Sequence, residues 1–104
     1  MAAAQRKTDA NTGGGTISSV PQSTVYANSK LLSVNGSSVT NHVLHVGATT
    51  ANGSSTVFAG GTAVNRTGDA DSCTHTRAGG SSTVNIGYIV ININITERLL
   101  NVKI

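Results

Sequence analysis

Apolar residues along this chain come in short clusters of β-branched side chains, separated by polar, glycine-rich stretches. Val and Ile supply most of the apolar content, with 11 and 7 copies among the 104 residues. β-branched residues bounded by Gly, Asn and Ser are typical of short strands joined by turns, not of helices. The pattern therefore predicts an all-β fold built from many short strands.

The two ends of the chain differ from this pattern. Isoleucine alternates with asparagine over residues 91–95, which predicts a strand of period two. The following TERLL (96–100) could form a helical turn, but Asn101-Val102 favours continued extended structure. The first twenty residues carry the turn-rich TDANTGGG, which predicts little local order there.

One short unit occurs three times in the sequence. STVYANSKLLSVNGS (23–37) aligns with STVFAGGTAVNRTGD (55–69) at an offset of 32, and STVNIG (82–87) begins a third copy. The N-terminus supplies the missing end of that third copy, since residues 6–9 match residues 66–69. Units this small cannot bury a face alone, so they must pack around a common axis. We therefore expect one domain over residues 1–104, with pseudo-threefold symmetry and one unit split between the two ends.

The composition limits the core and the possible partners. Gly, Ser, Thr and Asn supply 48 residues, and there is one Phe and no Trp, so the core must be thin. A net charge of only +3 and ordered β-branched clusters argue against disorder. The seven basic residues are scattered and not interleaved with aromatic residues, so we expect no nucleic-acid partner. We also expect no small-molecule substrate.

Features of secretion and membrane insertion are not found in the sequence. One cysteine excludes an internal disulfide framework. The opening MAAAQRKTDA has no apolar core of a signal peptide, and no segment has the length of a transmembrane helix. We therefore expect a protein that is made and folded in a bacterial cytoplasm.

All three histidines and the single cysteine follow corners of the repeat. In a threefold arrangement, the loops 38–52 and 70–80 should converge at one end of the axis. Three imidazoles and a thiolate form a closed four-coordinate shell, which is typical of structural zinc, with iron as a less favoured alternative. The simpler alternative is solvent-facing histidines and a small buried cysteine. The predicted ligands are His42, His45, Cys73 and His75.

An enzyme is the second class of function to consider. Asp69, Asp71, Cys73 and His75 lie close together, and a Cys–His pair with a carboxylate is the outline of a nucleophile. Short polar strands offer little concavity for a substrate, however, and the phosphate-loop and nucleophile-elbow motifs do not occur. We expect Asp69 to accept backbone N–H groups at its corner, and Arg66 either to pair with it or to be solvated. A small metal-stabilised or adhesin-like binding module is a third possibility.

The stretch GSSTVFAGGTAVNRTGDADSC (53–73) resembles a unit of the PAAR-repeat family. Ala63-Val64-Asn65-Arg66 stands in place of the signature tetrapeptide, the middle copy is more divergent, and Gly13 occupies the position of Cys73 in the N-terminal unit. The resemblance extends from about Ala2 to Gly87. The matching positions are Gly53-Ser54, Val57-Phe58, Gly61, Arg66, Gly68-Asp69 and Cys73.

The resemblance implies a small β-cone with zinc bound near its apex by three histidines and one cysteine. Family members cap the trimeric β-helical spike of contractile phage tails and type VI secretion systems, and help it to pierce the target cell envelope. Here it implies a non-enzymatic tip, one copy per spike trimer, with transient membrane contact. Only 17 residues follow Gly87, so we expect no effector domain. We expect the tip of a phage baseplate spike, in the virion, in preference to the tip of a type VI secretion spike. The predicted spike contacts are Val25, Val57, Phe58, Val84 and Ile86.

Overall fold

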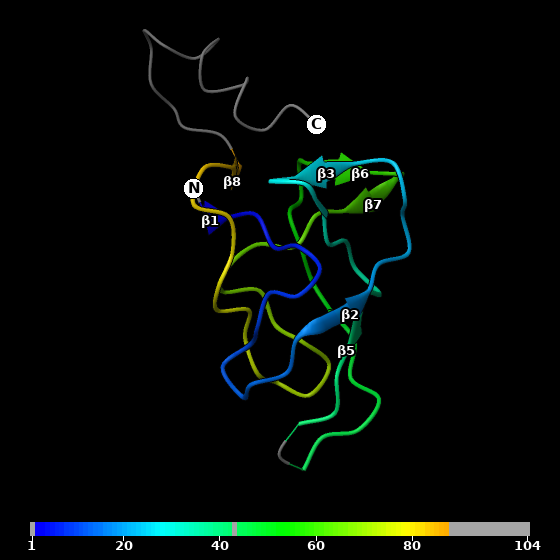
Figure 1. The fold of residues 1–104 in the computed structure, drawn as a ribbon, viewed down its shortest axis with the longest axis vertical. Helices are drawn as coiled ribbons and strands as arrows, with labels where there is room; N and C mark the ends of the chain where they lie inside the picture. Colours follow the sequence, from blue (N-terminus) through cyan, green and yellow to red (C-terminus); the bar gives the residue numbers. More distant parts are fainter. Residues whose placement is uncertain (1, 43, 88–104) are drawn as a thin grey trace, which may run out of the picture.

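The computed structural model describes residues 2–42 and 44–87, and these residues form an all-β fold (Figure 1). The prediction from the spacing of β-branched residues is confirmed. The strand expected over 91–95 and the segment after it lie outside the described residues. The strands are β1 (Ala2–Ala3), β2 (Ile17–Ser19), β3 (Tyr26–Ala27), β4 (Lys30–Leu31), β5 (Ser38–Val39), β6 (Phe58–Ala59), β7 (Thr62–Ala63) and β8 (Asn85–Ile86).

Three antiparallel strand pairs lie at one end of the molecule, at the top of Figure 1. Two of them are hairpins, β3–β4 and β6–β7, each closed by a two-residue turn. The third pairs β8 with β1, so Ile86 lies opposite Ala2 and the end of the repeat region meets its beginning. The unit split between the two ends of the sequence is therefore completed by strand pairing.

A closed ring of backbone hydrogen bonds marks the axis around which the three units pack. Gln5 N–H donates to Asn65 O at 3.1 Å, Asn65 N–H to Ser33 O at 3.0 Å, and Ser33 N–H to Gln5 O at 2.9 Å. All three residues are fully buried. Each unit thus donates to one neighbour and accepts from the other, as threefold symmetry requires. The pseudo-threefold repeat predicted from the sequence is confirmed.

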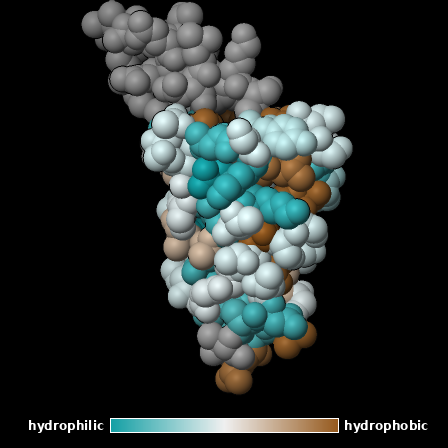
Figure 2. All heavy atoms as spheres, viewed as in Figure 1, coloured by the Kyte–Doolittle hydropathy of each residue, from teal (hydrophilic) through white to brown (hydrophobic). Residues whose placement is uncertain are grey.

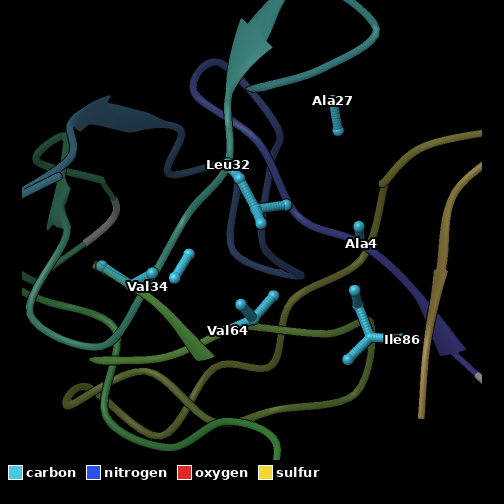
Figure 3. Close-up of a cluster of buried hydrophobic side chains, with 7 residues drawn as sticks. Ala4, Ala27, Leu32, Val34, Val64 and Ile86 are labelled. Atoms are coloured by element: carbon cyan, nitrogen blue, oxygen red, sulfur yellow. The ribbon is translucent and has the colours of Figure 1, made fainter. Parts of the chain in front are cut away.

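The apolar core surrounds this ring and is thin, as the composition predicts. Equivalent residues of the three units, Ala4, Leu32 and Val64, are each 0% exposed. The cluster is drawn in Figure 3, where its side chains point toward one another from different units. The core cluster consists of Ala4, Ala27, Leu32, Val34, Ala59, Val64 and Ile86.

Two of the three corners are closed by an arginine–aspartate pair. Arg66 donates from its backbone N–H and its Nε to Asp69 Oδ2, at 2.8 and 3.0 Å. Arg6 and Asp9 repeat this arrangement at 2.8 and 2.9 Å. In both pairs the hydrogen bond to the aspartate raises the pKa of the arginine, although burial opposes it. The corner role expected for Asp69 is confirmed, and of the two alternatives for Arg66 the structure shows the pair.

The molecule narrows from the hairpin end toward the loop 40–47 (Figure 2). A second set of cyclic bonds joins the units there: Thr12 N–H donates to Thr76 O, Thr40 N–H to Thr16 O, and Ser72 N–H to Thr49 O, at 2.7–2.9 Å. The N-terminal residues take full part in this layer, so the expectation of little local order there is wrong. Their glycine-rich turn is held by bonds to the other two units.

Candidate metal centre

The histidines and the cysteine lie at the narrow end, on two turns from different units. His42 and His45 exchange two backbone hydrogen bonds, at 3.0 and 2.7 Å, after strand β5. The turn from Asp71 to His75 closes with Asp71 N–H donating to His75 O at 2.7 Å. The two turns converge at one end of the axis, as the repeat predicted.

Three of the predicted ligands bring one atom each to a common point. His42 Nε2 lies 3.1 Å from His75 Nδ1. Cys73 Sγ lies 3.5 Å from His42 Nε2 and 3.6 Å from His75 Nδ1. This triangle is small enough for a single metal ion to touch all three atoms. The cluster of His42, Cys73 and His75 could therefore hold a metal ion.

The orientation of the His42 ring suits a metal ligand. Its Nδ1 lies 2.7 Å from Thr40 O, and because a carbonyl only accepts, Nδ1 carries the proton. The lone pair is then on Nε2, which faces the cluster. A hydrogen bond on the far nitrogen is the usual way in which a protein fixes a ligating imidazole.

The fourth predicted ligand, His45, is adjacent to the cluster but not part of its triangle. Its ring centroid lies 5.4 Å from that of His42 and 4.7 Å from that of His75, edge-on to the latter. Among the described residues, the atoms that converge are those of His42, Cys73 and His75. The sequence therefore predicted correctly that His45 lies beside the cluster, but its nitrogens are outside the group of convergent ligand atoms.

A buried polar network lies behind the cluster, and sequence reasoning missed it. Arg77 donates from its guanidinium to Asp71 Oδ2 at 2.8 Å, and both side chains are 0% exposed. Asn11 Nδ2 donates to the same oxygen at 2.8 Å and lies 3.3 Å from His42 Nε2. The Asp71 carboxylate, which the enzyme alternative placed beside Cys73, is thus paired with Arg77.

The predicted spike contacts lie at the broad end, with one correction. Phe58 is 55% exposed, and Tyr26, at the equivalent position of the middle unit, is also 55% exposed. Tyr26 was missed, although the alignment of the two copies places it opposite Phe58. Ile86 is only 1% exposed because its side chain packs in the core, so its assignment as a surface contact is wrong. The remaining predicted contacts are partly buried against the core: Val25, Val57 and Val84.

No family model matches the chain, and no curated protein matches it. Over the part of the chain that the structure describes, we find no helix with the length and apolar character needed to cross a membrane.

Proposed function

We propose that this protein is a structural tip that caps the trimeric central spike of a contractile injection machine, of the phage-tail or type VI secretion kind. The observation that carries the proposal is the closed ring through Gln5, Ser33 and Asn65. A homotrimeric spike ends in three equivalent strand edges. A single chain can satisfy all three edges only if it presents three similar surfaces around one axis, and the hairpin end of this protein does so.

The hairpin end has the chemistry of a docking face. Tyr26 and Phe58 expose aromatic rings at equivalent positions, and Asn85 stands at the third. Aromatic residues are enriched at protein interfaces because they bury a large area with few rotatable bonds.

The opposite end supports contact with a membrane. Leu44 and Val46 are 91% and 80% exposed, in a loop (40–47) that carries no Asp, Glu, Lys or Arg. Apolar side chains are the brown residues at the narrow end of Figure 2. A narrow apolar point concentrates force on a small area and loses no charge hydration on entering lipid. In this proposal the point pierces the target envelope when the machine contracts.

Zinc is the metal that we assign to the cluster. In a tetrahedral site with Zn–N of ~2.0 Å and Zn–S of ~2.3 Å, the ligand atoms lie about 3.3–3.6 Å apart. The distances among His42, Cys73 and His75 are 3.1, 3.5 and 3.6 Å. A mixed nitrogen and sulfur set favours zinc, with iron second. We assign the fourth position to His45, whose ring centroid lies 4.7 Å from that of His75 and whose nitrogen would have to move toward the triangle.

The docking face can be tested with paired variants at the two ends of the molecule. Tyr26→Asp and Phe58→Asp together should weaken binding to the trimeric spike of the same machine at least tenfold, because they place charge in an apolar contact. Leu44→Asp, at the narrow end, is the matched control and should bind like the parent. Isothermal calorimetry measures both. Equal loss in the control, or no loss in the double variant, would contradict the proposed orientation.

A further inference from the structure

We infer that Gly13 and Gly15 are positioning residues of the metal centre: the N-terminal unit contributes to the site by leaving out two side chains. The inference rests on the cluster of His42, Cys73 and His75, and it is independent of the spike as a partner. It extends the site from two units to all three.

Gly13 and Gly15 occupy the places that Cys73 and His75 hold in their own unit. Asn11 N–H donates to Gly15 O at 2.8 Å, just as Asp71 N–H donates to His75 O at 2.7 Å. The residue in the middle of each turn has a positive φ, 89° at Gly14 and 75° at Thr74. The two turns are therefore the same structure. The turn from Asp71 to His75 carries two ligand side chains, and the turn from Asn11 to Gly15 has glycines, without side chains, at the same two positions.

The space that these glycines leave is filled by the two imidazole rings. A Cβ on Gly13 would lie 2.3 Å from Cε1 and 2.4 Å from Nδ1 of His75. A Cβ on Gly15 would lie 2.4 Å from Nδ1 and 2.7 Å from Cε1 of His42. Neither glycine is among the residues with positive φ, so the backbone itself would accept alanine at both positions. What excludes a side chain at Gly13 is the ring of His75 in its ligating position; at Gly15 it is the ring of His42 together with Val39 Cγ1, which would lie 2.7 Å from the Cβ.

The glycine turn cannot easily move aside to make room. Asn11 Oδ1 accepts from the backbone N–H of Gly13 and of Gly15, at 2.9 and 2.8 Å. The amide of Asn11 is held in turn by Asp71 Oδ2, which is paired with buried Arg77. Because the turn is tied to this buried network, an added methyl group must displace the ring instead. A displaced ring takes its nitrogen out of the triangle.

The test is the zinc content of purified Gly13→Ala and Gly15→Ala variants, measured by plasma mass spectrometry after equilibration with zinc. We expect each variant to bind zinc at least tenfold more weakly than the parent. With cobalt in place of zinc, the thiolate-to-metal absorption band should shift or weaken, because one imidazole ligand has moved.

Two further glycines serve as controls. Gly79 has ordinary φ, and a Cβ there would meet its nearest atom at 3.8 Å, so Gly79→Ala should keep the metal and the stability. A Cβ on Gly53 would lie 2.6 Å from Val64 O, so Gly53→Ala should lower stability and still bind one zinc per folded chain. Parent-like zinc affinity in both the Gly13 and Gly15 variants would overturn the inference. So would a parent protein that holds no metal.

Discussion

At the scale of single residues, the metal centre depends on what each position of the repeat carries. Equivalent turns bear a cysteine and a histidine in one unit and glycines in another. His42 reaches the cluster from the middle unit and is fixed by its bond to Thr40 O. The site is therefore asymmetric although the backbone around it is nearly symmetric.

Loss of the thiolate should act on stability. Metal binding adds directly to the free energy of folding, so Cys73→Ser removes part of it, and a loss of about 3 kcal/mol would lower Tm by roughly 10–20 °C. The exposed Ser55 provides the control, since Ser55→Ala should melt like the parent. Calorimetry with and without a chelator makes the measurement. If Cys73→Ser melted like the parent, the metal would not stabilise the fold.

The two histidines of one turn should contribute unequally. His42 Nε2 is one of the three convergent atoms, and the ring of His45 has to turn before it can bind. We expect His42→Ala to abolish stoichiometric zinc binding and His45→Ala to weaken it about 10–100-fold, the range seen for residues that support a site. Competition with a chromophoric chelator gives both affinities. The reverse order would show that His45, not His42, anchors the ion.

At the scale of elements, the layer beneath the metal centre holds the buried Arg77–Asp71 ion pair at positions where other units have apolar residues. Arg77 has the position that Ile17 has in the N-terminal unit. The backbone N–H of Arg77 donates to the backbone carbonyl of Asp69 at 2.8 Å, and that of Ile17 donates to the backbone carbonyl of Asp9 at 3.1 Å. Asp71 has the place that Val39 has in the middle unit. Each of the two positions therefore carries an apolar side chain in one other unit, although Asn11 has the place of Asp71 in the N-terminal unit.

This equivalence predicts strong coupling between the two charges. Arg77→Ile alone leaves the carboxylate of Asp71 buried without its partner, which costs about 3–5 kcal/mol. The double variant Arg77→Ile with Asp71→Val should recover most of that loss, because a buried ion pair is often replaceable by apolar groups. Urea unfolding of the parent, of Arg77→Ile, of Asp71→Val and of the double variant completes the cycle. Additive losses would mean that the layer needs the ion pair for its shape.

The repeat explains why so much of this fold could be predicted from the sequence. Short β-branched clusters gave the all-β class, and the three copies of Ser-Thr-Val gave the threefold axis. The location of the metal ligands followed, because equivalent corners must point the same way. The Arg77–Asp71 pair and the two glycines could not be predicted, because they depend on which side chains face each other across the axis. Ile86 was misplaced for the same reason: the pattern of a two-residue strand does not say which residue faces inward.

At the scale of the whole molecule, the two ends have different chemistry around one axis. The broad end presents three strand pairs with two exposed aromatic rings, and the narrow end presents exposed Leu44 and Val46 beside the metal cluster. A cap that joins a trimer on one side and meets a membrane on the other needs this polarity. In the proposed function, the internal threefold repeat would allow a single chain to match the three equivalent strand edges of a trimer.

The narrow end can be tested apart from the spike. If Leu44 and Val46 enter lipid, the parent protein attached to nanobeads and pressed onto phosphatidylethanolamine–phosphatidylglycerol bilayers should break through at lower force than a Leu44→Ser, Val46→Ser double variant. The hydrophobic contribution lost is about 1.5–3 kcal/mol per side chain. Tyr26→Ser, at the other end, is the control. Equal breakthrough forces for all three proteins would contradict the role of the apolar loop.

The stoichiometry of the complex tests the proposed function, in which one chain caps one spike trimer. Native mass spectrometry of the complex with the trimeric spike should give a mass of three spike chains plus one copy of this 10.5 kDa chain. That ratio follows from three equivalent strand pairs on a single polypeptide. A complex with three copies per trimer, or no complex with the folded, metal-loaded protein, would contradict the account.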